Sequence, residues 1–190
     1  MGQESAKIGA RTLPTAIVSL QSVHAYLDAH APDLTIIEAP TSTATVALAA
    51  AAHGVAPGQI AKTLSLWLGD AVILLVMAGD ARLDNRKFKD RFGCKPRMLD
   101  AQEVLHWTSH PVGGVCPFGL PQALPIYTDV SLQRFETVIP AAGAVNAALR
   151  IRLERLVTLT AATWVDVAQA TAEAPPADGL SSVPAPSSPS

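Results

Sequence analysis

The chain has 190 residues, of which 49% are hydrophobic and 16% charged, and its formal net charge is −2 at pH 7. This composition is typical of an ordinary soluble globule, and the net charge gives no global attraction to nucleic acid. The longest apolar stretches, residues 44–52 and 71–78, are far shorter than the roughly 20 residues that a membrane span needs. The N-terminus does not have the pattern of a signal peptide, so we expect a cytoplasmic protein.

One folded domain is expected over residues 15–170. The first residues, 1–14, show no clear period and are expected to form a flexible lead-in. The last residues, 171–190, are almost all Ala, Pro, Ser, Gly and acidic residues, which cannot bury enough apolar surface to offset chain entropy. We therefore predict a disordered tail there.

The first half of this domain is predicted to hold two helices and three strands. Ser19 and Thr43 are candidate N-caps, and Gly54 is a candidate end for the second helix. Gly69-Asp70 separates two apolar runs, which is a strong hairpin signal. We expect this hairpin at the centre of the sheet. In chain order, the predicted elements are a helix over 19–31, a strand over 34–38, a helix over 43–54 and strands over 60–68 and 71–77.

The second half alternates shorter helices and strands. Asp84 and Asp100 are candidate N-caps, and Gly93 is a candidate helix end. The pattern predicts helices over 84–92, 100–107 and 153–159, and strands over 124–128, 137–140, 149–153 and 164–167. The expected fold is α+β, or mixed α/β. It is a single domain with a central mixed, largely antiparallel sheet flanked by helices.

Two features could carry chemistry. Lys62 interrupts an apolar strand, where a lysine either points to solvent or meets an anion in a cleft. From its position alone, a surface lysine is favoured. The loop 110–120 is rich in glycine and proline, which let backbone N–H groups approach a ligand and fix the loop shape. Such a loop could hold an ester carbonyl and stabilise an oxyanion, although glycine-rich loops are more often simple turns.

Other candidates are weaker. Cys116 could act as a nucleophile with His110 or His106 as its base, but a small buried thiol is favoured. No G-x-S-x-G motif is present, and Asp129 could simply cap a turn with Ser131. The two cysteines lack metal-ligand spacing, so we expect no metal and no cofactor.

A local basic window contrasts with the acidic chain. It contains seven cations and only two acidic residues, Asp84 and Asp90. A patch that binds nucleic acid and a solvated helix face explain it about equally well. The cations are Arg82, Arg86, Lys87, Lys89, Arg91, Lys95 and Arg97.

The order of these features resembles one family. The chain is similar to the YbaK/ProX proteins and to the inserted editing domain of bacterial prolyl-tRNA synthetases. The matching segments are 60–64, 79–84, 113–119, 126–132 and 141–143. Together they span most of the expected domain, which makes the resemblance more specific than any one motif.

The resemblance implies a trans-acting aminoacyl-tRNA deacylase that hydrolyses the ester of a mischarged tRNA carrying a small amino acid. It implies the acceptor end of aminoacyl-tRNA as partner, with a synthetase as a further candidate partner. Water or a ribose hydroxyl of the substrate would be the nucleophile. By this resemblance, the catalytic residues are Lys62, Gly113 and Gly114. The substrate-binding residues are Thr63, Val115, Cys116, Pro117, Phe118, Gly119, Asp129, Ala141 and Gly143. Within the basic window, the candidate tRNA-binding residues are Arg82, Arg86, Lys87 and Lys89.

The chain departs from the family pattern at two places. Ala141 stands where YbaK relatives often have serine, and Val145 and Asn146 stand where the prolyl-tRNA synthetase editing domains have histidine. The alanine at position 141 leaves a rival hypothesis open, namely a non-catalytic module that binds tRNA or a nucleotide as the partner of a synthetase. The departures also leave open which amino acid is removed. A thiol hydrolase using Cys116 is a third reading.

Overall fold

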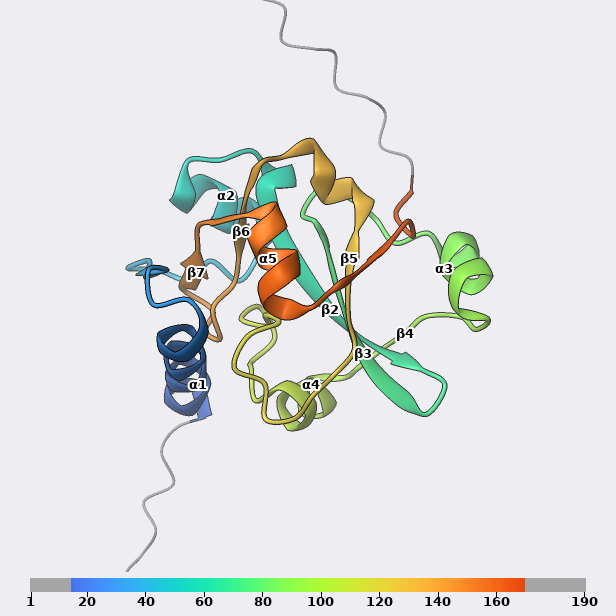
Figure 1. Cartoon of the computed structure of the whole chain (residues 1–190), viewed down its shortest axis with the longest axis horizontal. Helices are drawn as coiled ribbons and strands as arrows, with labels where there is room; N and C mark the ends of the chain where they lie inside the picture. Colours follow the sequence, from blue (N-terminus) through green and yellow to red (C-terminus); the bar gives the residue numbers. More distant parts are fainter. Residues whose placement is uncertain (1–14, 170–190) are drawn as a thin grey trace, which may run out of the picture.

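The computed structural model describes residues 15–169, and it describes the side chains from residue 19 onward. The predictions for residues 1–14 and 171–190 lie outside the described residues. Within them, five α-helices surround a mixed sheet (Figure 1). The predicted mixed α/β fold is confirmed. None of the helices in this range is long and apolar enough to cross a membrane.

The secondary structure alternates in short elements. The helices are α1 Thr15–His30, α2 Val46–His53, α3 Asn85–Phe92, α4 Ala101–Thr108 and α5 Leu153–Thr160. The strands are β1 Ile36–Glu38, β2 Ile60–Leu68, β3 Ala71–Ala78, β4 Arg97–Met98, β5 Ile126–Asp129, β6 Thr137–Pro140, β7 Ala147–Leu149, β8 Ile151–Arg152 and β9 Thr163–Val165. Two 3-10 turns are η1 Pro57–Gln59 and η2 Val130–Arg134.

The β2–β3 hairpin lies at the centre of the main sheet, as predicted. The strand order is β8-β6-β2-β3-β5-β9, with β4 also paired to β2. The hairpin is antiparallel, whereas β6 joins β2 and β5 joins β3 in parallel. Residues 72–78 of β3 are all buried, because elements cover both faces of this strand. A second, two-stranded sheet pairs β1 with β7.

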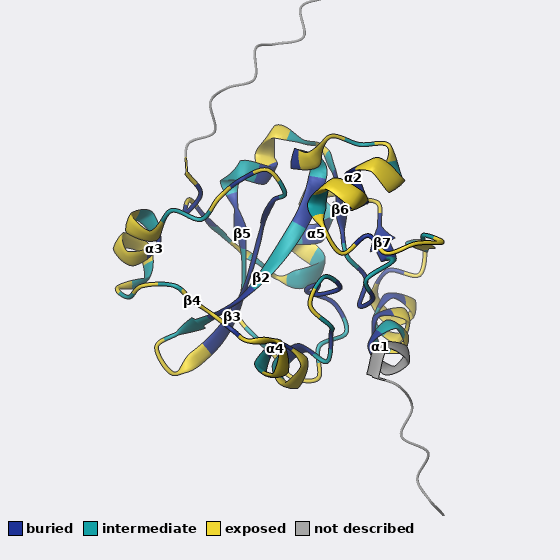
Figure 2. Ribbon diagram, turned by 180° about the vertical axis from the view of Figure 1, so that it is seen from behind, coloured by how far each residue is buried: buried dark blue, intermediate teal, exposed yellow. Residues whose placement is uncertain are grey.

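The helices stand on different sides of this sheet. In Figure 1, α1 and α2 lie on one side of the molecule and α3 on the opposite side, and the view from behind in Figure 2 agrees. Figure 2 also shows α3 largely exposed, while β3 is buried. The basic helix is therefore separated from α2 by the width of the sheet.

Local cap signals were mostly correct. Asp84 and Asp100 accept hydrogen bonds from the first-turn N–H groups of α3 and α4. Gly54 and Gly93 end their helices in the left-handed conformation, as expected.

Three local predictions were wrong, and one short strand was missed. The first helix does not begin at Ser19: α1 starts at Thr15, and Ser19 is a buried residue within it. Thr45 rather than Thr43 caps α2, because the Thr43 hydroxyl instead donates to the carbonyl of Val145 at 3.0 Å. The strand predicted over 149–153 is divided into β7 and β8, which pair with different strands. The two-residue strand β4 was not predicted.

Candidate functional site

A cavity of about 240 Å³ opens beside the start of β2. The N-terminal end of α2, the loop around Gly113 and the segment from β6 to β7 form its other walls. Small apolar side chains dominate the lining, and no acidic residue, histidine or cysteine is among the described residues that line it. The lining residues are Thr43, Ala44, Thr45, Val46, Ala49, Ile60, Ala61, Lys62, Thr63, Gly113, Val115, Ile139, Ala141, Ala147 and Ala148.

Lys62 is the only cation among those lining residues. Its ammonium group donates to the backbone carbonyls of Gly79, at 3.0 Å, and Ala81. Burial lowers the pKa of Lys62, Asp80 raises it by its opposite charge, and Arg82 lowers it further. Since an ammonium has three protons and two are engaged here, one donor remains for a ligand. The lysine is thus half-buried at a cavity, not a freely solvated surface residue.

Thr63 also lines this cavity. Its Oγ1 atom is buried and has no hydrogen-bond partner among the described residues. A buried hydroxyl without a partner costs free energy. Because Oγ1 has almost no accessible surface, Thr63 forms part of the cavity wall and does not present its hydroxyl to the cavity.

The loop at Gly113 carries the candidate oxyanion donors. The N–H groups of Gly113 and Val115 donate to no acceptor within residues 15–169. The N–H of Gly114 donates to the carbonyl of Pro111 at 2.9 Å, and Gly114 does not line the cavity. We therefore correct the assignment of Gly114: its N–H belongs to the loop's own turn, and the available donors are its two neighbours.

Five of the predicted site residues are brought together, and the others are not. One cavity is lined by Lys62, Thr63, Gly113, Val115 and Ala141. Most of the rest are buried in the packing behind it, so a substrate at the cavity does not contact them directly. Those outside the lining are Gly114, Cys116, Pro117, Phe118, Gly119, Asp129 and Gly143.

Asp129 illustrates why some of these residues serve the fold. Its carboxylate is fully buried and accepts hydrogen bonds from the N–H groups of Ser131, Val167 and Ala168 at 2.8–3.1 Å. These bonds cap η2 and fasten the chain that follows β9. The turn-capping interpretation of Asp129 with Ser131 therefore fits the structure.

Cys116 and His110 do meet, which the sequence spacing did not indicate. The Cys116 sulfur lies 3.5 Å from Nε2 of His110, but both residues are fully buried. Burial raises the pKa of the Cys116 thiol to about 12. A nucleophilic cysteine needs an accessible thiolate, so this pair lacks both the charge state and the access of a thiol hydrolase.

We predict that Cys116 resists alkylation in the folded protein. At about pH 8 the thiolate of Cys116 is scarcely populated, because its pKa lies far above that pH, whereas Cys94 is partly exposed. Iodoacetamide followed by peptide mass spectrometry should label Cys94 and leave Cys116 free until the chain is unfolded. Rapid labelling of Cys116 in the folded protein would contradict this prediction and support the thiol hydrolase hypothesis.

The basic window divides into paired and unpaired cations. Arg86 pairs with Asp90 at 3.9 Å, and Lys87 pairs with Asp166 at 2.7 Å. Five others have exposed side chains and no ion pair within the described range. These are Arg82, Lys89, Arg91, Lys95 and Arg97. The unneutralised charge thus lies partly on residues other than the four predicted to bind tRNA.

Several cavity residues were missed by the sequence reasoning. Most are alanines or valines, whose side chains have no chemical signature, and they include Ala44, Ala147 and Ala148. The only usable signal was the density of alanine around Gly143. Val145 and Asn146, where the family resemblance implies a histidine, do not line the cavity. Within residues 15–169, no three His, Cys, Asp or Glu side chains gather to hold a metal ion.

Comparison with known proteins decides the family. The family model of the aminoacyl-tRNA editing domain matches residues 40–159, which include the whole cavity lining. The chain belongs to the aminoacyl-tRNA editing domain family. The resemblance to prolyl-tRNA synthetase editing regions is confirmed by a proline–tRNA ligase of Moorella thermoacetica. That ligase is 34% identical over 79 residues, which are 41% of this chain and 14% of the ligase.

Two further relatives of this editing domain cover most of the chain. YwhH of Bacillus subtilis, an uncharacterized protein, is 45% identical over 152 residues, which are 79% of this chain and 97% of YwhH. A solved structure described as a "putative trans-editing enzyme for prolyl tRNA synthetase" superimposes with a TM-score of 0.75 at 31% identity. That match covers 83% of this chain and 99% of the solved chain, so the two chains share one fold over most of their length.

Proposed function

We propose that this editing domain acts in trans as an aminoacyl-tRNA deacylase, hydrolysing the ester of a mischarged tRNA that carries a small amino acid. The observation that carries the proposal is the composition of the cavity. A half-buried lysine and two residues with unengaged backbone N–H groups, Gly113 and Val115, line a small space together with several alanines. This arrangement offers charge and donors to an ester while restricting the size of the side chain attached to it.

The chemistry follows from the groups that line the cavity. Water attacks the ester carbonyl carbon, a neighbouring ribose hydroxyl of the substrate can relay the proton that water loses, and a tetrahedral oxyanion forms. Attack by the ribose hydroxyl itself would only move the acyl group to another ribose oxygen, so water must act as the nucleophile that releases the amino acid. The N–H groups of Gly113 and Val115 donate to that oxyanion. The carbon–oxygen bond to the terminal ribose then breaks, and the ribose oxygen takes up a proton. The products are a free amino acid and a tRNA with an intact 3′ end. Because no acidic residue, histidine or thiol of the described range lines the cavity, the proposal assigns the protein positioning and electrostatic roles.

The cavity also supports selection by size. A synthetase pocket distinguishes side chains that differ by one methylene only about 10- to 200-fold, so a second and smaller sieve has a use. Walls formed by Ala44, Ala141, Ala147 and Ala148 leave room for a small side chain beside the ester. Alanine, serine, threonine and cysteine are the candidates. The prolyl-tRNA synthetase relatives favour a tRNA mischarged by that synthetase, with the synthetase as a further partner.

For the bound tRNA, we propose that the basic segment from Arg82 to Arg97 contacts phosphates. Arg82 lies close enough to Lys62 to lower its pKa, so this segment begins near the cavity and continues to α3. The phosphate backbone of a tRNA whose 3′ end lies in the cavity would therefore meet unpaired cations along this segment. We place the enzyme in the cytoplasm, where its substrate is made.

This assignment predicts a selective effect on affinity. Replacing Lys89, Arg91 and Lys95 by glutamine should weaken tRNA binding and reduce the slope of log affinity against log salt by about 0.9 for each lost duplex phosphate contact. The matched control is Arg152→Gln, which removes an exposed cation paired with Glu136 outside this segment. Filter binding at several salt concentrations measures both. Equal slopes in the triple variant and the control would contradict the assignment.

A non-catalytic module is the alternative, favoured by the absence of an acid–base side chain from the described lining. It predicts tRNA binding without product. The distinguishing experiment follows a mischarged tRNA in a single turnover and recharges the recovered tRNA. Release of amino acid with fully rechargeable tRNA supports the deacylase, whereas binding with the ester intact supports the module.

Cys116→Ser should retain deacylation within about threefold, since Cys116 is not at the cavity.

A further inference from the structure

A buried polar cluster joins α1 to the two loops that border the cavity. Its members Ser19, His110 and Cys116 have no exposed surface. The Ser19 hydroxyl lies 2.6 Å from the carbonyl oxygen of Gly143 and 2.5 Å from Nδ1 of His110. On the other side of the ring, Nε2 of His110 lies 2.9 Å from the carbonyl oxygen of Phe118. The imidazole thus spans α1 and the glycine-rich loop.

The two loops are also bonded to each other. The N–H of Gly143 donates to the carbonyl of Gly114 at 3.0 Å, and Gly114 sits between the two candidate oxyanion donors. A Cβ atom at Gly114 would approach the backbone of Ala144 at 2.8 Å, so the loops are in close contact. The spacing of these loops therefore sets the distance between Ala141 on one wall and Gly113 and Val115 on another.

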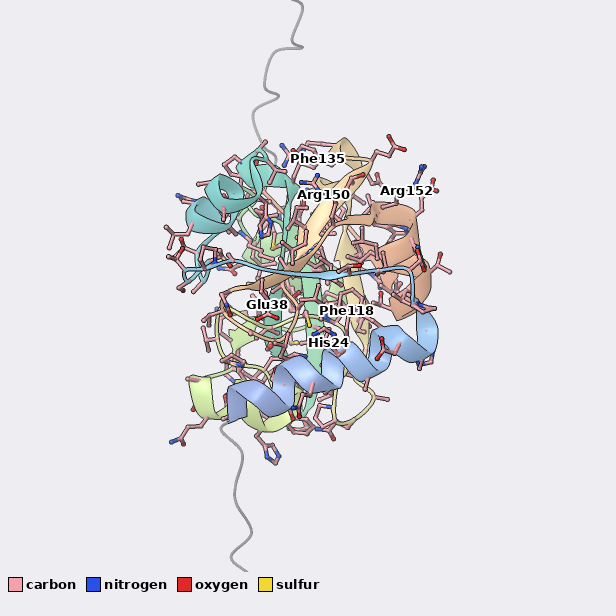
Figure 3. All side chains as sticks on the ribbon, turned by 90° about the vertical axis from the view of Figure 1, so that its left-hand side faces the viewer. His24, Glu38, Phe118, Phe135, Arg150 and Arg152 are labelled. Carbon is pink, nitrogen blue, oxygen red and sulfur yellow. The ribbon has the colours of Figure 1, made fainter. Side chains whose placement is uncertain are left out.

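Helix α1 closes this cluster from outside. Figure 3 shows α1 running across this side of the molecule with Phe118 close behind it, and the Tyr26 and Phe118 rings lie 5.9 Å apart. Residue 119 is glycine because a Cβ atom there would lie 2.5 Å from the backbone of Ser22. Helix α1 precedes the residues matched by the editing-domain family, yet it supports the walls of the cavity.

The hydrogen-bond partners and the burial of the ring together indicate the form of the imidazole. The Phe118 carbonyl can only accept a hydrogen bond, so Nε2 carries the ring proton. Burial lowers the pKa of His110, which keeps the ring neutral and leaves Nδ1 as an acceptor. The Ser19 proton is then shared between Nδ1 and the Gly143 carbonyl. Cys116, the other titratable group in contact, stays a neutral thiol because of its high pKa.

We propose that His110 is a positioning residue. Through Ser19 on one ring nitrogen and the Phe118 carbonyl on the other, it holds the loop of Gly113 and Val115 against the loop of Ala141 and Gly143. The catalytic part of this inference rests on the proposed deacylase function. The structural part does not, so the two can fail separately.

The first test measures loop rigidity without any substrate. Native-state hydrogen exchange of the Gly114 and Gly143 amides, both hydrogen-bonded, should accelerate about tenfold in Ser19→Ala and His110→Gln. Ser22→Ala is the matched control, because its hydroxyl donates only to the Ser19 carbonyl within α1. In ¹⁵N spectra, neutral His110 should show the Nε2–H tautomer, and its pKa should lie below the ordinary histidine value of about 6.5 because of its burial.

The second test measures catalysis on a mischarged tRNA. Ser19→Ala should lower kcat about tenfold with KM unchanged, since tRNA contacts lie elsewhere and only donor alignment is lost. Wild-type exchange rates and wild-type kcat in a folded Ser19→Ala protein would overturn the positioning role. If the wild-type protein hydrolyses no ester, the proposed function fails, and the exchange rates still decide whether His110 holds the loops.

Discussion

Replacing Lys62 by alanine should slow deacylation by about 100-fold or more, because we expect its ammonium group to polarise the ester carbonyl beside the N–H groups of Gly113 and Val115. Removing one donor to a developing oxyanion causes a loss on this scale. Two backbone carbonyls hold its ammonium group, and the third proton is left for the substrate. Partial burial strengthens such a contact, because fewer water molecules screen it. Single-turnover hydrolysis of a mischarged tRNA measures the loss, and thermal unfolding checks that the fold is intact.

Two further variants separate charge from shape in this experiment. Lys62→Met keeps a long side chain without the ammonium and should be as slow as Lys62→Ala. Arg152→Ala removes a cation from an exposed ion pair with Glu136, worth about 1 kcal/mol at most, and should hydrolyse at the wild-type rate. Wild-type hydrolysis by Lys62→Met would remove Lys62 from the mechanism.

Gly113→Ala should both destabilise the fold and slow hydrolysis. Gly113 has a φ of +89°, and an added Cβ atom would lie 2.8 Å from the Cβ of Ala44 across the cavity wall. Left-handed backbone strain plus this clash should cost about 2–3 kcal/mol of unfolding free energy. Displacement of the donor loop should reduce the hydrolysis rate at least about tenfold, because donor alignment is sensitive to small shifts.

The matched control for this substitution is Gly69→Ala in the β2–β3 turn. Gly69 also has a positive φ, +61°, but an added Cβ atom there meets nothing within 4 Å. This variant should lose about 1 kcal/mol of stability and no activity. Denaturant unfolding and hydrolysis rates compare the two proteins. If Gly113→Ala were as active as Gly69→Ala, the loop around Gly113 could not hold the ester.

Features set by neighbouring residues were predicted well from the sequence. Contacts within a few residues determine the turn at Gly69-Asp70, the helix caps at Asp84 and Asp100 and the helix end at Gly93. Ser19 shows where such rules fail. As a serine near a helix start it has the pattern of a cap, but its hydroxyl is used in a tertiary contact with Gly143. The division of residues 149–153 also depends on distant partners, β1 and β6.

The site was only partly predictable for the same reason. Lys62 and the glycine-rich loop stand out because a lysine in an apolar strand and clustered glycines are unusual. The alanines of the lining do not, since alanine is compatible with almost any environment. The turn in which the Gly114 N–H donates to the Pro111 carbonyl determines which N–H groups of the loop are free. Only the three-dimensional structure shows this turn. Likewise, the sequence did not show that both Cys116 and His110 are buried, and this burial is what argues against a catalytic role for their contact.

The most direct test of the account is hydrolysis across a panel of charged tRNAs. The protein would be incubated with tRNAs carrying alanine, serine, threonine, cysteine or proline, and the loss of each ester would be followed beside Lys62→Ala. The account predicts rapid loss of one or more of the four small aminoacyl esters and slower loss of the prolyl ester. With Lys62→Ala, the esters should be lost no faster than in buffer alone. Ester loss at the rate of buffer alone across the panel, with tRNA binding intact, would contradict it.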